Sequence, residues 1–560
     1  MTISAELRAR VEAWIALDPD PDTVAEAEGL IAANNEDGLR ERFDDRLAFG
    51  TAGLRGPLGA GPNRMNELVV RQTAAGLADY VLEVVPNATK RGVVIGYDAR
   101  HKSDRFAEAT ARVFANKGMR ALLFPHHVPT PVLAYAVLDL GVAVGVQVTA
   151  SHNPPADNGY KVYWADGPQI VPPLDEFIAA AINKVAASND PVVLSAPTDS
   201  LIETLSDDVI DRYHAGVAEL DPHTSSAAER SSLRIVYTAM HGVGGVDLVR
   251  TLNDAGFSTV NPVPEQFAPD PDFPTVAFPN PEEKGALDLA LALAASTSAD
   301  LILANDPDAD RMAAAIPDPG DPRGWRPLRG DEIGWLLADH LLRLPERSEK
   351  RRLVQTTIVS SSMLSAMAAH FDVEYRETLT GFKWLARKAL QENSYEHVLS
   401  YEEALGYCVG SLVRDKDGIS AALVMADLAA TLKAAGTTLA SRLQELEAMY
   451  GRFDTEQWSL RFDGADAQQK MKALMDKLRA TLPLEVAGVK VRSVRDLENE
   501  SPPADVVIFA LEDGSRITVR PSGTEPKCKV YFETVTKPGS ESVSIARLKS
   551  SMAAVLGTSE

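Results

Sequence analysis

The order of the predicted elements constrains the fold of this 560-residue chain most strongly. Three segments each read as a short apolar strand that enters a turn and then a helical stretch; they lie at residues 91–98, 233–238 and 352–357. Alternation of strands and helices predicts mixed or mostly parallel sheets sandwiched by helices. The three segments do not repeat residue for residue, so the pattern indicates a shared topology. We expect three topologically similar α/β domains with mixed sheets.

A fourth unit begins near Met449 and follows a different pattern. It reads as a strand, a helix over residues 468–481, further strands and a final helix. This order predicts a C-terminal α+β domain. Helical segments and a Pro-rich break at residues 317–322 predict four domains: 1–206 with a helical extension over 1–48, then 207–324, 325–448 and 449–560.

Composition narrows the class of protein. The chain is 45% hydrophobic and 24% charged, which is typical of a globular protein. Its net charge of −23 argues against nucleic acid or an anionic membrane as a partner. Its two cysteines, Cys408 and Cys528, are too few for a disulfide framework, and no apolar run approaches membrane-span length. Because the N-terminus also lacks an apolar leader, we expect a cytoplasmic protein.

A serine lies where the first polar loop begins. Ser151 belongs to the segment Thr149–Pro154 and follows the apolar run 142–148. A buried strand that ends in such a turn presents a hydroxyl at a sheet edge, where a nucleophile can meet its substrate. An ordinary Ser-Asn-Pro turn is the alternative. His152 adjoins the serine and is a candidate base, but neighbours on an extended chain point opposite ways, so we expect it mainly to shape the loop.

The second polar loop, 305–311, carries three alternating carboxylates. Asp306, Asp308 and Asp310 can all face one side of an extended loop that follows the apolar run 299–304. Three crowded like charges repel and raise one another's pKa unless a cation neutralises them. Oxygen ligands without nearby His or Cys favour Mg²⁺ over zinc. The loop therefore predicts a magnesium site, with a solvated acidic turn as the alternative.

Two further loops carry groups that suit a sugar phosphate. In the segment 400–407, Glu402 and Glu403 could accept hydrogen bonds from sugar hydroxyls, although paired glutamates are commonly a solvated surface. Near the C-terminus, the segment 520–526 combines a guanidinium fork, hydroxyls and a flexible backbone, which is the inventory of a phosphate cradle. Those groups belong to Arg520, Ser522, Gly523 and Thr524. A surface turn between strands is the alternative.

Taken together, the four loops resemble the α-D-phosphohexomutases, which include phosphoglucomutase and phosphomannomutase. Their order along the chain is the family order, and the resemblance extends to the segments 49–56, 96–100 and 414–418. The N-terminal segment 11–49 is similar to the branch that holds the phosphopentomutases and glucose-1,6-bisphosphate synthases. The resemblance implies a heart-shaped, four-domain architecture around a central cleft.

The resemblance also implies roles for single residues. Ser151 would carry a phosphoryl group and complete the Mg²⁺ shell of Asp306, Asp308 and Asp310. Arg55, Arg311 and Lys161 match positions that stabilise the transferring phosphate, and Lys161 is also the family's proposed general acid/base. Glucose 1,6-bisphosphate would act as the activator. The expected partners are small sugar phosphates, and the expected state is a monomer or homodimer.

Several positions depart from the bacterial phosphomannomutase/phosphoglucomutase pattern. The sugar loop has Ala404 and Gly406 where that pattern has a serine and a histidine, and a second histidine would fall at Phe382. Glu402 keeps the role of binding sugar hydroxyls, and Lys383 is a candidate phosphate contact. With fewer polar contacts, the site should tolerate several sugars.

The implied activity is the interconversion of sugar 1-phosphate and 6-phosphate. Glucose 1-phosphate is placed first because it is the commonest substrate of the resembling group; phosphomannomutase and phosphopentomutase are the alternatives. A serine-nucleophile phosphatase is a distant alternative that would need a second metal, usually with His ligands. A non-catalytic sensor is disfavoured because Ser151 and all three aspartates are present.

Overall fold

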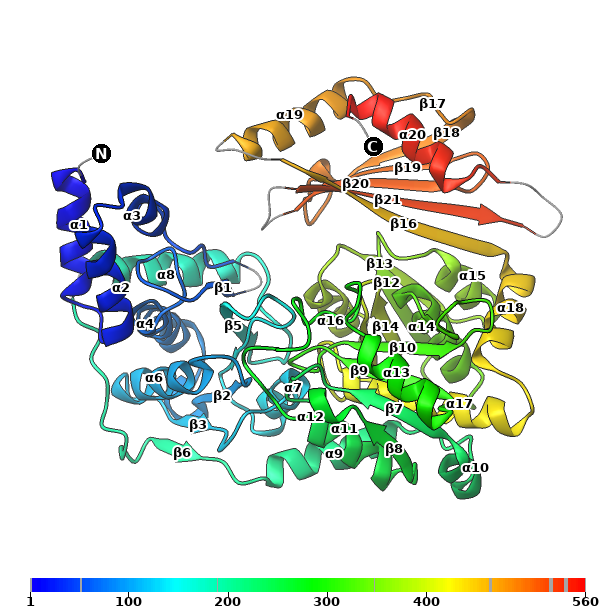
Figure 1. The fold of residues 1–560 in the computed structure, drawn as a ribbon, viewed down its shortest axis with the longest axis horizontal. Coiled ribbons are helices and arrows are strands. Elements are labelled where there is room, and N and C mark those ends of the chain that lie inside the picture. The colour runs from blue at the N-terminus through cyan, green and yellow to red at the C-terminus, as the bar shows by residue number, and fades with distance from the viewer. Residues whose placement is uncertain are drawn as a thin grey trace.

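The computed structural model describes residues 3–50, 53–188, 190–346, 348–462, 466–522, 527–537 and 542–558. Four sheets follow one another along the chain, and each forms the centre of one domain. Figure 1 shows the first three domains side by side, with the fourth lying above the third.

The first domain is built on a mixed sheet of order β1-β5-β4-β2-β3-β6. Its strands are β1 (Leu54–Pro57), β2 (Val93–Tyr97), β3 (Ala121–Leu123), β4 (Val144–Val148), β5 (Asp157–Trp164) and β6 (Ile202–Thr204). Its helices are α4 (Glu67–Val84), α5 (Ala88–Arg91), α6 (Ser103–Asn116), α7 (Thr130–Asp139) and α8 (Leu174–Ser188). Helices α4, α6 and α8 pack on one face of the sheet, and α7 packs on the other.

Three helices precede this domain and lie at its outer edge (Figure 1). They are α1 (Ala5–Ile15), α2 (Pro21–Ala32) and α3 (Glu36–Phe43). Ser4, Asp20 and Asn35 cap them, each accepting a hydrogen bond from a backbone N–H of the first turn. Their small core includes Trp14 and Phe43, whose rings meet edge to face.

The second domain has a mixed sheet of order β11-β10-β9-β7-β8. Its strands are β7 (Arg234–Thr238), β8 (Thr259–Pro262), β9 (Leu301–Asn305), β10 (Met312–Pro317) and β11 (Trp325–Pro327). Its helices are α9 (Asp208–Leu220), α10 (Ala227–Ser232), α11 (Gly245–Asp254), α12 (Pro264–Phe267) and α13 (Asp288–Thr297).

The third domain has a mixed sheet of order β13-β12-β14-β15. Its strands are β12 (Arg352–Thr357), β13 (Glu374–Thr378), β14 (Glu396–Glu402) and β15 (Gly406–Val409). Its helices are α14 (Gly330–Leu342), α15 (Met363–His370), α16 (Phe382–Gln391), α17 (Gly418–Ala434) and α18 (Leu439–Tyr450). Helix α17 packs against β15 of its own domain and against β9 and β10 of the second, so it joins the two.

The fourth domain is an antiparallel sheet of order β16-β21-β20-β19-β18-β17. Its strands are β16 (Arg452–Arg461), β17 (Glu485–Val486), β18 (Val489–Asp496), β19 (Val507–Leu511), β20 (Arg516–Pro521) and β21 (Lys527–Thr536). Its helices α19 (Ala467–Ala480) and α20 (Ile545–Leu556) cover one face. Alternation along β19 turns Val507 and Phe509 toward these helices and Ile508 toward the third domain.

The predicted architecture of three mixed α/β domains and a C-terminal α+β domain is confirmed. The predicted boundary between the second and third domains, after the Pro-rich segment 317–322, falls close to the end of the second sheet. In the structure β11 pairs antiparallel with β10, so the second sheet extends to Pro327. The segment is therefore the loop of a hairpin, and a boundary between residues 324 and 325 cuts through the second sheet. Proline has no backbone N–H to donate, so it is tolerated both in hairpin loops and in linkers. A Pro-rich segment alone does not distinguish the two.

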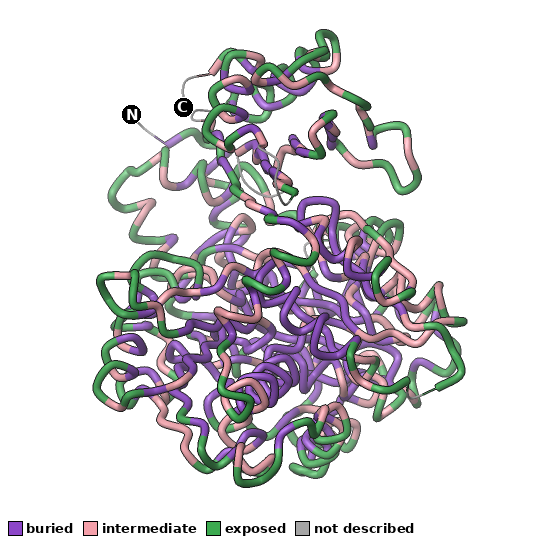
Figure 2. The backbone as a smooth tube through the Cα atoms, turned by 90° about the vertical axis from the view of Figure 1, so that its right-hand side faces the viewer, coloured by how far each residue is buried: buried purple, intermediate pink, exposed green. Residues whose placement is uncertain are grey.

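The buried residues form one large core and several smaller ones. Among the described residues, a continuous core runs from α7 of the first domain through the second and third domains. Figure 2 shows this concentration of buried residues in the larger body. The fourth domain has its own core, and a small cluster of Ile358, Val359, Leu497, Val506, Ile508 and Tyr531 joins it to the third.

Within the described part of the chain, no single helix combines the length and hydropathy needed to cross a membrane. The bent pair α17 and α18 reaches these values together, by length and composition only, and most of α17 is buried.

Candidate active site

Ser151 lies in the loop between β4 and β5, at the end of a fully buried strand. Its backbone is left-handed, with φ 51°, and only 3% of the residue is exposed. Arg100 holds the loop, since its guanidinium donates to the carbonyl oxygens of Ser151 (2.6 Å), Asn153 (2.6 Å), Pro154 (2.8 Å) and Asp157 (3.0 Å). Four bonds from one rigid group fix the position of the hydroxyl.

The hydroxyl of Ser151 points into the second domain. Its Oγ donates to Oδ2 of Asp306 at 2.9 Å, across the junction between the two domains. His152 Nδ1 lies 3.2 Å from the same Oγ. The expectation that these neighbours point apart is therefore wrong, because it assumed an extended chain and the backbone at Ser151 is left-handed.

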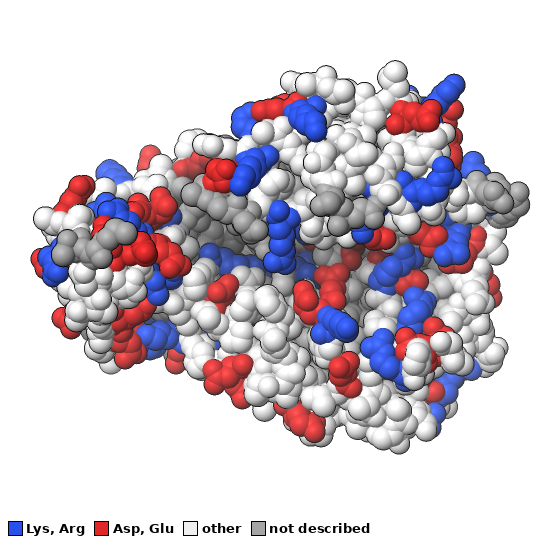
Figure 3. Space-filling view, turned by 45° about the horizontal axis from the view of Figure 1, so that its top comes forward, with Lys and Arg blue, Asp and Glu red and all other residues white. Residues whose placement is uncertain are grey.

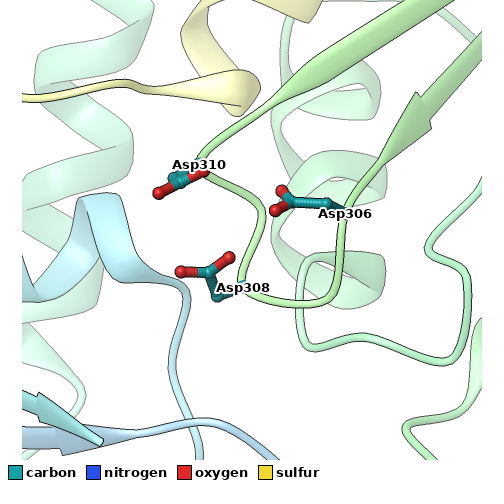
Figure 4. A group of neighbouring side chains, drawn as sticks. All are labelled: Asp306, Asp308 and Asp310. Carbon is teal, nitrogen blue, oxygen red and sulfur yellow. The ribbon is translucent and has the colours of Figure 1, made fainter. Parts of the chain in front are cut away.

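The three aspartates form a compact cluster. Asp306, Asp308 and Asp310 lie in the loop between β9 and β10, and one carboxylate oxygen from each lies within 4.8 Å of the others. Figure 4 shows the three side chains along that loop, with the carboxylate of Asp306 directed toward those of Asp308 and Asp310. All three residues are buried.

Two lysines balance this negative charge. Lys161 of β5 donates to Asp308 Oδ2 at 2.6 Å and to Asp310 Oδ2 at 2.9 Å. Lys416, which comes from the third domain, forms an ion pair with Asp310 at 3.1 Å. Thr130 Oγ1 also donates to Asp308 Oδ2, at 2.6 Å. Residues of all three α/β domains therefore meet at the triad.

The electrostatics of the cluster are dominated by burial and mutual charge. Burial, together with the charges of Asp308 and Asp310, raises the pKa of Asp306 well above its usual value. Burial alone would lower the pKa of Lys161, but the charges of Asp308 and Asp310 raise it, so the ammonium form is retained. Burial and the positive charges of Arg311 and Arg55 lower the pKa of His152 well below its usual value, which keeps the imidazole neutral.

The cluster fits a hard divalent cation. The donors are carboxylate oxygens, and among the described residues no His or Cys belongs to the group. Oδ1 of Asp308 and Oδ1 of Asp310 are buried without a hydrogen-bond partner in the structure, so both are available as ligands. Oxygen-only ligation favours Mg²⁺. Asp306, Asp308 and Asp310 could hold Mg²⁺, and Ser151 Oγ lies beside them.

Two arginines flank the serine and the triad. Arg55 Nη1 donates to Asn153 Oδ1 at 3.1 Å, which places it on the Ser151 loop. The backbone N–H of Arg311 donates to Asp306 Oδ1 at 3.0 Å, and its Nη1 donates to the carbonyl oxygen of Ala404 at 3.0 Å. Arg311 therefore links the triad to the predicted sugar loop.

The sugar loop connects β14 and β15 of the third domain. Glu402 Oε1 accepts from the backbone N–H of Gly381 at 2.8 Å. Glu403 is turned to protein hydroxyls instead, because its Oε2 accepts from Ser360 Oγ at 3.0 Å and from Thr357 Oγ1 at 3.3 Å. Of the two predicted sugar acceptors, Glu402 is thus the one that faces the cluster containing Arg311 and Lys416.

The departures found in this loop have structural reasons. A Cβ at Gly406 would lie 2.4 Å from Cδ of Lys416, so the lysine stem takes the space of a side chain there. Phe382 is buried against Leu385 and Cys408, with its ring 5.8 Å from Lys416 Nζ. Neither position offers a polar group to a ligand.

Lys383 lies in the first turn of α16, two residues after Gly381, whose N–H binds Glu402. Burial lowers its pKa to about 8, despite the negative charges of Asp175 and Glu402. A lysine with such a pKa changes charge near physiological pH. A dianionic phosphate would favour its charged form.

The predicted phosphate cradle lies at the turn between β20 and β21. Arg520 pairs with Lys529 across these strands, and the N–H of Ser522 donates to the carbonyl oxygen of Lys527 at 2.8 Å. Gly523 and Thr524 lie outside the described residues. Figure 3 shows a furrow beneath the fourth domain, along which lysine and arginine side chains stand together with acidic ones.

Sequence reasoning missed three groups at this site. Arg100 belongs to a segment of the family resemblance but has no role predicted for it, and neither Thr130 nor Lys416 is predicted as a site residue. Each acts on a residue far away along the chain, so no local pattern reveals it. The Asp-Lys-Asp spacing at 415–417 is the one local signal for Lys416.

The fold thus brings a serine hydroxyl beside three carboxylates that could hold a cation. Models of the phosphoglucomutase/phosphomannomutase domains match in order along the chain: alpha/beta/alpha domain I at residues 46–189, domain II at 211–320, domain III at 329–450 and the C-terminal domain at 465–544. The chain belongs to this family, the α-D-phosphohexomutases, and is a phosphomutase.

Named relatives span nearly the whole chain. A probable phosphoribomutase of Schizosaccharomyces pombe is 41% identical, covering 94% of this chain and 93% of the relative. A probable phosphomannomutase of Haemophilus influenzae is 43% identical over 84% of this chain and 93% of its own length. The human glucose 1,6-bisphosphate synthase is 34% identical, covering 95% of this chain and 90% of the relative. These relatives confirm the predicted branch.

Solved structures support the fold. The crystal structure of a putative phosphomannomutase from Thermus thermophilus superposes with a TM-score of 0.69, over 92% of this chain and 99% of that one. Its sequence is 23% identical, so the likeness concerns the fold alone.

Proposed function

We propose that this phosphomutase moves a phosphoryl group between O1 and the terminal hydroxyl of aldose phosphates, and that it accepts ribose as well as glucose and mannose phosphates. The observation that carries the proposal is the Ser151 hydroxyl, 2.9 Å from a buried carboxylate triad and flanked by cationic side chains. The triad and the serine come from different domains, so their approach depends on the whole fold.

Ser151 would carry the phosphoryl group in the resting enzyme. The terminal hydroxyl of a sugar 1-phosphate takes that group, which gives a sugar bisphosphate. The bisphosphate reorients within the site, and its phosphate at O1 is then transferred to Ser151. Bound Mg²⁺ would supply Lewis-acid stabilisation of the phosphoryl oxygens. Lys161, Arg55 and Arg311 would balance the remaining negative charge, since phosphoryl transfer depends mainly on positioning and charge stabilisation. Arg520 and Ser522 would hold the phosphate that does not react.

The proton acceptor is constrained by the pKa shifts. Lys161 holds its proton because two carboxylates raise its pKa. His152 is neutral, but its strongly lowered pKa makes it a weak base. Lys161, whose ammonium group pairs with Asp308 and Asp310, suits charge stabilisation, and His152 suits loop geometry.

The sugar loop supports a broad substrate range. Ala404 offers a methyl group, Gly406 offers no side chain, and Phe382 is buried, so Glu402 is left as the principal acceptor for ring hydroxyls. A site rejects an analogue strongly only where its own polar groups would be left unpaired. Similarity to a relative named a probable phosphoribomutase supports a pentose phosphate as a substrate of this chain at least as well as a glucose phosphate. We therefore no longer place glucose first, and propose that ribose and glucose phosphates are both substrates.

Three further expectations remain part of the proposal. Glucose 1,6-bisphosphate would start the cycle by phosphorylating Ser151, which agrees with a relative named for the synthesis of that compound. The cytoplasmic location rests on the two cysteines, which are buried and free, as a reducing compartment would leave them. Small sugar phosphates would be the partners of a monomer or homodimer.

A substrate panel tests the proposal. We expect ribose, glucose and mannose 1-phosphates, assayed with glucose 1,6-bisphosphate and Mg²⁺, to give kcat/KM values within about 10⁴-fold of one another. The matched control is Ser151→Ala, which should lose both turnover and the added mass of about 80 Da of a phosphoserine. Turnover that persists in Ser151→Ala would contradict the mechanism. Release of inorganic phosphate without isomerisation would indicate a phosphatase instead.

A further inference from the structure

The three helices of the N-terminal extension lie outside the matched family domains, which begin at residue 46. They share their small core with two residues of the first domain, Ala60 and Leu68. We propose that this extension is a positioning element for the Ser151 loop, acting through two acidic anchors, Asp20 and Glu26.

The first anchor is a buried carboxylate. Asp20 is fully buried, and its Oδ2 accepts from Lys102 Nζ at 2.6 Å, with Arg105 Nη1 at 3.7 Å. Burial acts to raise the pKa of Asp20, but the bond from Lys102 leaves it below its usual value, so the ion pair is intact at neutral pH. The partner lysine belongs to the first domain, so the pair ties the extension to it.

Lys102 lies two residues from the arginine that holds the serine loop. The turn from Asp98 to Ser103 has a left-handed residue at Lys102, with φ 64°. Within that turn, the N–H of Arg100 and the hydroxyl of Ser103 both donate to Asp98 Oδ1, at 3.0 and 2.7 Å. Asp20 therefore fixes the outer side of the turn whose inner side carries Arg100.

The second anchor grips the loop that follows β1. Glu26 Oε2 accepts from the backbone N–H of Ala60 at 2.8 Å, and its Oε1 accepts from Arg42 Nε at 3.0 Å. The same loop begins at Leu58, whose N–H donates to the carbonyl oxygen of Ala156 at 2.8 Å. Ala156 lies within the Ser151 loop, and β1 itself carries Arg55.

The Ser151 loop is thus held from two sides, and both supports rest on the extension. Arg100 binds it through four carbonyl oxygens, and Leu58 binds it through a fifth. A residue in a left-handed conformation persists only where its surroundings determine it. The extension supplies part of those surroundings at Ser151, while Asp20 and Glu26 themselves act through other residues and are positioning residues.

The test compares Asp20→Asn, Glu26→Gln and their double variant with the control Glu12→Gln. Glu12 is an exposed residue of the same extension, paired only loosely with Arg8 at 3.9 Å. We expect the double variant to lose about tenfold or more in kcat with KM changed less than about twofold, because the nucleophile is displaced while the substrate contacts remain. The control should match the wild type.

Hydrogen exchange gives a readout that needs no turnover. The amides of residues 149–157 should exchange at least about fivefold faster in the double variant than in the control. This arm separates the proposal from the proposed mutase function, on which the kinetic arm rests. Wild-type kcat together with wild-type exchange in this segment would overturn the positioning role, as would a KM effect as large as the kcat effect.

A double-mutant cycle tests the route. If Asp20 acts through Lys102, then Asp20→Asn combined with Lys102→Met should lower kcat no further than the more damaging single variant, within about twofold. If the kcat losses of the two single variants multiply in the double variant, Asp20 acts by a path that does not include Lys102. Lys102→Met also probes the anchor from the domain side should the substitutions in the extension prevent folding.

Discussion

At the scale of single residues, burial decides what the charged groups of this site can do. Asp306, Asp308 and Asp310 are all fully or almost fully buried, a cost that only neutralising charge can offset. Lys161 and Lys416 supply part of that charge, and two carboxylate oxygens remain without partners. The residue types and their alternation were enough to predict a cation site. The two lysines come from other domains: the family resemblance placed Lys161 at the site, whereas Lys416 had no predicted role.

Asp308→Asn should lower kcat by at least about 100-fold, a loss of roughly 3 kcal/mol of transition-state stabilisation. Asparagine keeps the shape but removes the charge opposite Lys161. Chelation of divalent metal should have the same effect in the wild type, reversed by added Mg²⁺. Asp321→Asn, in the loop of the β10–β11 hairpin, is the matched control and should be neutral. Full activity in the presence of a chelator would refute the metal role.

Lys383 predicts a pH dependence of substrate binding. Its pKa of about 8 means that the ammonium form dominates below that pH and is lost as pH rises through it. KM for a sugar 1-phosphate should therefore rise above about pH 8, by up to roughly tenfold for one charge-assisted contact. KM is measured from initial rates between about pH 6.5 and 9.5, a range that includes the pKa of Lys383. Lys383→Arg should flatten the profile, and an identical profile in that variant would exclude Lys383.

At the scale of elements, the site is made of loops that follow strands. The Ser151 loop follows β4, the aspartate loop follows β9, and the sugar loop follows β14. Apolar runs that end in polar turns predicted the first two, and the paired glutamates with the family resemblance predicted the third. The β10–β11 hairpin was missed because a Pro-rich segment resembles a linker when the pairing partner of the next strand is unknown. The grip of Arg100 was missed because its acceptors are backbone carbonyls, which any sequence supplies.

The approach of α14 to the sugar loop predicts the effect of one methyl group. A Cβ at Gly330 would lie 1.9 Å from the carbonyl oxygen of Glu403, a backbone atom that cannot swing aside. Gly330→Ala should therefore shift the sugar loop and raise KM about tenfold or more while the domain stays folded. Gly29→Ala, where a Cβ would meet nothing within 4 Å, should leave the kinetics unchanged. Steady-state kinetics and circular dichroism of both variants decide the matter; unchanged KM in Gly330→Ala would show that the loop is not set by this approach.

At the scale of the whole molecule, separate cores divide the chain. One core runs from α7 of the first domain through the second and third, the opposite face of the first sheet has a core of its own, and the fourth domain has another. The fourth domain meets the third through Phe453, a small apolar cluster and a few polar contacts. Arg516 of the fourth domain pairs with Glu377 of the third at 3.0 Å, and Glu533 accepts from the N–H of Ser362 at 2.7 Å. The sequence predicted a distinct C-terminal unit from its α+β order. How it docks depends on side chains that meet only in the folded state.

Separate cores predict separate unfolding. Differential scanning calorimetry should resolve at least two transitions, because a fourth domain joined by so small a cluster can melt without the larger body. Ile508→Ala should shift the transition of the fourth domain without splitting that of the larger body. A single transition with equal calorimetric and van't Hoff enthalpies would show that the four domains unfold as one.

The left-handed backbone of Ser151 has a consequence for how selection has shaped this loop. Alanine is normally the more stable choice over glycine, but at φ 51° a Cβ is strained and glycine is not. Ser151→Gly and Ser151→Ala lose the same hydroxyl, so their difference isolates the backbone. We expect the glycine variant to be more stable by about 1 kcal/mol in chemical denaturation, and the reverse order would mean that the loop relaxes once the hydroxyl is gone. Selection for stability alone would favour glycine at this position, so a serine here agrees with the proposed role of its hydroxyl as the nucleophile.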